Sequence, residues 1–349
     1  MQAPQTLTDF IQSTDVSFRL FDMGRRVSKL SRTTFHSVEL AKTPYPLPYM
    51  QQAWIGILLW NPKQPAQQLI WFLKFPLDEQ GLLVQAARDD FLGRLAHCVG
   101  KQLLQNAAEH DPLKDNPFAF SPDQEKMAAF HAKATLILRQ PASSFYQPGR
   151  DYLSGLRGYD HWQTLGIQGI ADICSRLDQD CNDAVLSRAI EHLPLPALNA
   201  FAAQLEHQTP STALSQSLSR RLQRELEHNN CAPTAVAALL RGLSLSHNDT
   251  SRRADLLAVL ESDYATDVEV LVAIAGRCWK DLTNPELRGA FVEALSRNPT
   301  GQSAFNRILA DLLFIPGMRA LLMDSLRNPE RSDQLAQALG GFFSQVRRS

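Results

Sequence analysis

Two stretches in the first half of the chain are apolar at nearly every position. Residues 53–60 read AWIGILLW and residues 69–76 read LIWFLKFP. Short runs that are apolar on both faces are typical of β-strands covered on both sides of a sheet. The polar segment NPKQPAQ between them is long enough to join them antiparallel. We therefore predict a pair of central antiparallel strands.

Another strand pair is predicted closer to the N-terminus. Residues 16–22 alternate between apolar and polar side chains, which is the period of a strand. Met23-Gly24 can form a tight turn, and residues 25–30 can return antiparallel. Together with the helical segments around them, these stretches predict a small α/β domain of about four antiparallel strands.

In the second half the apolar positions recur at helical spacing. Eleven helical segments can be laid out, with starts near residues 160, 183, 196, 212, 234, 251, 266, 285, 301, 317 and 332. Prolines fall in most of the connections between them, where they end or restart a helix. Segments of about a dozen residues joined by short turns are typical of antiparallel helix pairs.

The tripeptide Arg-Asn-Pro ends one of these segments at residues 297–299 and another at residues 327–329. A helix pair that recurs at about this period is typical of an α-solenoid. The helical rhythm resembles the HEAT/armadillo class of helical repeats over about 190 residues. The whole chain also resembles a family of gammaproteobacterial proteins without an assigned function. The first resemblance implies an architecture, and neither implies an activity.

We expect two domains and an α+β fold: an antiparallel-sheet α/β domain over residues 1–158, followed by an all-α HEAT-like repeat domain over residues 159–349. The composition changes between them. Eight of the nine lysines lie before residue 134, and Lys280 is the only one after it. The second domain therefore takes nearly all of its positive charge from arginine, which indicates two units with different surfaces.

The composition and the five widely spaced cysteines indicate a protein of a reducing compartment. The hydrophobic fraction is 44% and the charged fraction 20%, as in ordinary globular proteins. No Cys-x-x-Cys pair is present, and most of the cysteines fall in or beside apolar helical stretches, so we expect buried, reduced thiols. We see no signal peptide and no apolar run long enough to span a bilayer. We expect a cytoplasmic protein, and its net charge of -1 argues against generic binding of polyanions by the whole chain.

The familiar catalytic and cofactor motifs are absent from the sequence. There is no phosphate-binding GxxxxGK[ST], no GxGxxG after a strand, no HExxH, no GxSxG and no zinc-type Cys/His spacing. We therefore predict no cofactor and no metal site. Because catalytic groups can also be assembled in space from distant segments, an enzyme stays possible.

Five arginines are candidates for partner binding. Arg220, Arg221 and Arg224 lie on the helix predicted to start near residue 212, opposite its leucines, and Arg252 and Arg253 begin a later helix. Guanidinium groups suit carboxylate and phosphate partners, so we hypothesise that they dock an acidic protein segment. The alternative is a solvated helix face whose glutamates offset the charge.

Two further groups of residues are candidate sites. Tyr159, Asp160, His161 and Trp162 stand at the predicted domain boundary and could line an interdomain pocket. The alternative is that Asp160 caps a helix and Trp162 packs between the domains. Arg25 and Arg26 follow the first hairpin turn, where exposed arginines could grip an anion or simply keep the turn soluble.

We expect a non-enzymatic cytoplasmic adaptor or regulator that binds protein partners, without membrane association. The basis is the large surface of a helical-repeat domain together with the lack of a catalytic motif. One alternative is association with nucleic acid through the arginine-rich helices. A second alternative is an enzyme with an interdomain pocket near residues 159–162.

Overall fold

The structure is a computed structural model that describes residues 5–99, 113, 115–227 and 232–346. The chain divides into two compact units. One comprises residues 1–130 with 314–316, and the other comprises residues 131–313 with 317–349. Their boundary at residue 130 lies within a helix, earlier than the boundary at residue 158 that the sequence suggested.

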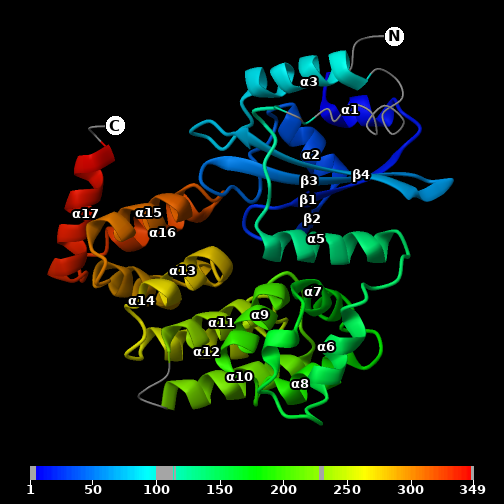
Figure 1. Cartoon of the computed structure of the whole chain (residues 1–349). Coiled ribbons are helices and arrows are strands. Elements are labelled where there is room, and N and C mark those ends of the chain that lie inside the picture. Colours follow the sequence, from blue (N-terminus) through cyan, green and yellow to red (C-terminus); the bar gives the residue numbers. More distant parts are fainter. Residues whose placement is uncertain (1–4, 100–112, 114, 228–231, 347–349) are drawn as a thin grey trace. The chain divides into compact units, whose positions relative to one another are not determined.

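The first unit is built on an antiparallel sheet (Figure 1). Its elements are α1 (Leu7–Gln12), β1 (Ser17–Asp22), β2 (Ser28–Leu30), α2 (Arg32–Glu39), β3 (Gln52–Asn61), β4 (Gln64–Pro76), α3 (Gln85–Val99) and the first part of α5 (Gln124–Ile137). The four strands are ordered β2-β1-β3-β4. The sheet, followed by a helical unit, confirms the expected α+β fold.

The hairpin between β3 and β4 is tighter than predicted. Gln64 already belongs to β4 and pairs with Asn61, so most of the polar segment 61–67 is strand rather than loop. The side chains described at this end of the hairpin are largely exposed to water. Backbone pairing satisfies the peptide groups there, so a strand can continue without apolar side chains.

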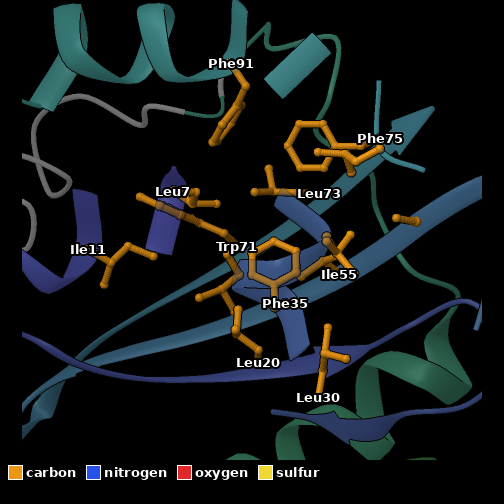
Figure 2. Packing of buried hydrophobic residues seen from close by; sticks show 14 of the residues in the cluster. Leu7, Ile11, Leu20, Leu30, Phe35, Ile55, Trp71, Leu73, Phe75 and Phe91 are labelled. Carbon is orange, nitrogen blue, oxygen red and sulfur yellow. The ribbon is translucent and has the colours of Figure 1, made fainter. Parts of the chain in front are cut away.

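Both faces of the sheet are covered, as predicted for β3 and β4, but only β3 is a central strand and β4 lies at the edge of the sheet. On one face Trp71, Leu73 and Phe75 of β4 belong to the main apolar core, and Phe91 of α3 contacts Phe75 edge-on (Figure 2). On the other face Phe130 of α5 packs against aromatic rings of β1 and β4. The alternation of side chains along each strand thus sends aromatic groups to both faces.

The second unit is helical. It contains the last part of α5, then α6 (Tyr146–Leu153), α7 (Ile167–Ser175), α8 (Asn182–Ala189), α9 (Leu195–Leu205), α10 (Thr212–Glu227), α11 (Pro233–Leu243), α12 (Asp249–Leu260), α13 (Val268–Arg277), α14 (Pro285–Ser296), α15 (Gln302–Leu313), α16 (Met318–Leu326) and α17 (Asp333–Val346), with short 3-10 turns η1 (Trp162–Thr164) and η2 (Asp281–Thr283). The helices α7 to α17 correspond in order to the eleven predicted segments. The first starts at residue 167 rather than 160, because η1 and a short loop precede it.

Alternate helices of this unit pack against each other in two series. One series runs α6, α8, α10, α12, α14 and α16, and the other runs α7, α9, α11, α13, α15 and α17; each helix contacts the next member of its series. Leu198, Phe201, Leu222 and Phe291 are among the residues fully buried between them. The predicted leucine and phenylalanine stripes therefore form the core of the helical unit.

The thiols follow the sequence expectation in part. Cys174 and Cys278 are buried and reduced, whereas Cys181 is exposed. Burial raises the pKa of Cys174. Cys231 and the side chain of Cys98 lie outside the described residues. Among the helices that the structure describes, none combines the length and apolar character that crossing a bilayer requires.

Candidate functional site

A polar pocket of about 580 Å³ lies at the start of the helical unit. It is formed by the end of α5, the loop that leads to α6, the first turn of α6 and the loop between α7 and α8. Its polar lining includes Arg139, Gln140, Gln147, Arg176, Gln179 and Asp180. We call it the α6 pocket.

Arg176, which lines the α6 pocket, forms a buried ion pair with Asp172. Arg176 and Asp172 are 4% and 1% exposed, and Nη1 of Arg176 lies 3.0 Å from Oδ1 of Asp172. The guanidinium also donates to Thr135 of α5 at 2.9 Å, and Oδ2 of Asp172 accepts from the backbone N–H of Ser143 at 2.9 Å. Burying two charges is costly unless further hydrogen bonds satisfy them, and here both ions have such bonds. The pair therefore fixes α5 and the α5–α6 loop to α7.

Arg139 stands at the rim in a left-handed backbone conformation, with φ of 55°. Helix α5 ends there in a Schellman motif: the N–H of Gln140 donates to the carbonyl of Thr135, and the N–H of Arg139 to that of Leu136. Glycine usually occupies this position because a side chain costs about 1–2 kcal/mol in the left-handed region. The side chain of Arg139 is exposed and makes no hydrogen bond or ion pair with the residues described.

The opposite rim is the loop between α7 and α8, which is also held in a strained conformation. Asp180 and Cys181 have φ of 49° and 57°. Tyr146 donates to Oδ2 of Asp180 at 2.8 Å, and Arg150 donates to the carbonyl of Asp180 at 2.6 Å. Asn182 donates to the Tyr146 hydroxyl at 2.7 Å. Burial, together with the Asp180 carboxylate, raises the pKa of Tyr146.

An exposed apolar ring borders the pocket. Phe145 is 52% exposed and lies between the lining residues Ser144 and Tyr146. Its backbone carbonyl faces Gly169 of α7, where a Cβ atom would come within 2.3 Å. Only a residue without a side chain lets α7 approach this closely. The ring of Phe145 therefore presents apolar surface to solvent beside the pocket.

The sequence matches a known protein family along nearly the full length of the chain. A family described as Protein of unknown function (DUF3549) matches residues 2–343. The chain belongs to this family. The match confirms the expected resemblance to a family without an assigned function. Neither the comparison with curated proteins nor the comparison with solved structures gives a match.

The arginines predicted on α10 bond within the fold. Arg221 donates to the carbonyls of Ile190, Glu191 and Leu193, just after the end of α8. Arg224 donates to the carbonyl of Glu191 at 2.7 Å, and Arg220 pairs with the Glu191 side chain at 2.7 Å. Carbonyls at a helix C-terminus lack partners in the helix and attract positive charge. Docking of an acidic partner by these three residues stays a prediction, but the structure gives each of them an internal role.

Arg252 also has an internal role. Its guanidinium lies 2.8 Å from Oδ1 of the buried Asp281 and 2.8 Å from Asp249. Hydrogen bonding to Asp281 raises the pKa of Arg252 above its usual value. Arg253 lies 3.7 Å from the same Asp281 oxygen, and 41% of its side chain is exposed. Arg252 therefore fastens α12 to the turn before α14, and partner binding by either residue stays a prediction.

Residues 159–162 all lie inside the helical unit. The ring of Tyr159 stacks on His192, with centroids 6.2 Å apart, and its carbonyl accepts a hydrogen bond from Tyr152 at 2.9 Å. Asp160 and His161 are exposed, and Trp162 begins η1. The interdomain pocket stays a prediction, and the observed contacts are packing contacts with α6 and the α8–α9 loop.

The expectation that Arg25 and Arg26 are exposed was wrong. They are 0% and 4% exposed, and Nε of Arg25 donates to the carbonyl of Pro48 at 2.8 Å. The adjacent Asp22 accepts from the Tyr45 hydroxyl at 2.8 Å. Burial raises the pKa of Asp22 to about 6. The proline-rich connector that carries Tyr45 and Pro48 covers the turn, which the local sequence could not show.

Proposed function

We propose that the protein is a non-enzymatic adaptor or regulatory protein whose helical unit binds a protein partner, and that a segment of the partner docks in the α6 pocket. The observation that most supports this proposal is the conformation of Arg139. Its backbone is held in a conformation that favours glycine, while its side chain is exposed at the rim of the pocket. Strained residues that persist in a fold often serve a site rather than the fold.

The packing of the helical unit supports this proposal. We propose that the two series of alternately packed helices form an α-solenoid of the HEAT type, and such units commonly present extended surfaces for protein partners. The α6 pocket lies at the first helices of one series. Hydrogen bonds from both rims and from Arg176 hold its shape, which lowers the entropic cost of binding.

The lining indicates the chemistry of the partner. Arg139 can donate a bidentate hydrogen bond to a carboxylate, and Phe145 beside it can pack against an apolar side chain. Asp180 on the opposite rim suits a backbone N–H or a hydroxyl group of the bound segment. We therefore propose a partner segment in which an acidic residue is adjacent to a large apolar residue.

Selection from a displayed random-peptide library, with the full chain as bait, tests this. We expect enriched peptides to carry an aspartate or glutamate beside a large apolar residue. Fluorescence anisotropy should show that Arg139→Glu weakens their binding at least about tenfold, which corresponds to about 1.4 kcal/mol. Arg157→Glu reverses an exposed arginine outside the lining and should leave binding unchanged. Enriched peptides without an acidic residue, or equal binding by the Arg139→Glu variant, would contradict the proposal.

A cross-linking experiment in cells tests the same surface without a selected peptide. A photo-reactive amino acid is placed at position 145 and, as a control, at Val272, which is 50% exposed on α13. We expect a cross-linked protein from position 145 that is absent from position 272 and that disappears when Arg139→Glu is added. Identical products from both positions would show that the α6 pocket has no dedicated partner.

A further inference from the structure

A second pocket, of about 310 Å³, lies between the start of α10, the turn from α11 to α12, and the first half of α12. We call it the α10–α12 pocket. Its lining is mostly hydroxyl and other polar side chains, among them Thr212, Ser215, Ser246, His247, Ser251 and Asp255. Their hydroxyl, imidazole and carboxylate groups can form hydrogen bonds that orient a bound ligand.

Two of the lining residues are buried, and each has a polar atom to which no described residue forms a hydrogen bond. Asp255 is 5% exposed and Ser215 is 8% exposed. Oδ1 of Asp255 accepts a hydrogen bond from Ser219 at 2.8 Å, and the side chain of Gln223 also interacts with the carboxylate. Within the part of the chain that the structure describes, no hydrogen bond of ordinary geometry reaches Oδ2 of Asp255 or Oγ of Ser215. Buried polar atoms are nearly always paired, because an unpaired one costs about 1–3 kcal/mol.

The guanidinium of the nearby Arg252 does not neutralise the carboxylate of Asp255. Arg252 lines the same pocket, but its guanidinium is engaged by Asp281 and Asp249. Asp255 forms no ion pair with the residues that the structure describes. No described residue therefore supplies a counterion to Asp255, in a pocket with room for several waters or a small molecule.

We propose that the α10–α12 pocket binds a small molecule carrying a protonated primary amine, whose ammonium group donates to Oδ2 of Asp255 and to the hydroxyl of Ser215. The ammonium supplies both the missing counterion and the missing donor. Burial raises the pKa of Asp255, and the side chains of Ser219 and Gln223 oppose that shift. A bound cation would further favour the ionised carboxylate.

Binding is tested by isothermal titration calorimetry of the full chain with three amines and their hydroxyl counterparts: ethanolamine and ethylene glycol, 1,4-diaminobutane and 1,4-butanediol, glycinamide and glycolamide. We expect at least one amine to bind saturably and at least about tenfold more tightly than its counterpart. If none of the amines binds at millimolar concentration, or if the hydroxyl counterparts bind equally well, the proposal is overturned.

Variants locate the binding site. Asp255→Asn keeps the volume of the side chain and should abolish the preference for the amine, and Ser215→Ala should weaken binding several-fold. Asp263→Asn removes an exposed carboxylate outside the lining and should bind like the wild type. Circular dichroism establishes whether each variant folds. If Asp255→Asn does not fold, the binding measured with Ser215→Ala tests the proposal. Wild-type binding by both pocket variants would place the amine elsewhere. Peptide binding at the α6 pocket should be unaffected by either substitution, which separates the two proposals.

Discussion

Nη1 of Arg221 on α10 lies 2.9 Å from the carbonyl oxygen of Glu191, just beyond the end of α8. Comparable links recur along the series of even-numbered helices. Arg150 of α6 donates to the carbonyl of Asp180 before α8, Arg252 of α12 pairs with Asp281 before α14, and Arg288 of α14 donates to Ser325 of α16. Arginine can make several hydrogen bonds from one planar group, so one side chain joins successive helices at several points.

Arg221→Lys should destabilise the helical unit. A lysine ammonium cannot reproduce the planar donors that reach the carbonyls of Ile190, Glu191 and Leu193, so we expect a loss of about 1–2 kcal/mol in the free energy of unfolding. Urea denaturation followed by circular dichroism measures it. Arg220→Lys, at a side chain that is 58% exposed, should change stability by less than about 0.5 kcal/mol. Equal effects of the two substitutions would show that the carbonyl contacts of Arg221 do not stabilise the unit.

The arginines show where sequence reasoning succeeded and where it stopped. The apolar period placed Leu214, Leu218 and Leu222 in the core of α10, and all three are buried. The same period placed the arginines on the opposite face but could not reveal that the end of α8 lies against that face. Helical spacing reports which side of a helix is apolar, and it carries no information about which backbone groups approach the polar side.

The α6 pocket was missed for a related reason. The contacts beside it join Thr135 of α5 to Asp172 and Arg176 of α7, which are two segments far apart in the sequence, and its rim depends on the left-handed backbone of Arg139. Glycine normally signals such a turn, and an arginine there gives no signal in the sequence. Helix α7 satisfies its own local pattern and matches a predicted segment, whereas α6 (Tyr146–Leu153) lies in a stretch with proline and glycine that was not predicted to be helical.

Gly169→Ala should destabilise the helical unit strongly. A Cβ atom at Gly169 would lie 2.3 Å from the carbonyl oxygen of Phe145, which is backbone and cannot rotate away, so we expect a loss of more than about 2 kcal/mol. Gly289 of α14 has open space around its Cβ position, so Gly289→Ala should stabilise by about 0.5–1 kcal/mol. Thermal unfolding of the two variants beside the wild type measures both effects. A stable Gly169→Ala variant would show that α7 and the α5–α6 loop are not held this close together.

Glu206 should make the stability of the helical unit depend on acid pH. Its side chain is buried and lies 2.6 Å from Arg241 and 2.8 Å from Arg277. Burial raises the pKa of Glu206, but the charges of Arg277, His207 and Arg241 lower it by more than burial raises it. The pKa therefore falls to about 2, from an ordinary value of 4.5. Because the folded pKa is the lower one, the stabilisation is present above about pH 4.5 and is lost as the pH falls towards 2.

Glu206→Gln tests this assignment. The variant loses both ion pairs, so at neutral pH it should be less stable than the wild type by roughly 3 kcal/mol, and the difference should shrink to near zero as the pH approaches 2. The measurement is the free energy of unfolding in urea across this pH range. Glu261→Gln, which removes an exposed charge at the end of α12, should follow the wild-type curve. A difference that stays constant with pH would assign the effect to packing instead of charge.

Arg139→Gly should separate the stability of the α6 pocket from its proposed function. Glycine adopts the left-handed conformation of position 139 without strain, so the variant should gain about 1 kcal/mol in the free energy of unfolding. It also loses the exposed guanidinium, so it should bind the selected acidic peptides at least about tenfold less tightly. Arg139→Lys keeps both the strain and the charge and should change stability little while retaining part of the binding. Urea denaturation and fluorescence anisotropy on the same preparations measure both quantities. If Arg139→Gly gains stability without losing peptide binding, the arginine serves neither the fold nor the pocket. If it gains stability and loses binding, the strained backbone at position 139 is kept because the arginine side chain binds the partner.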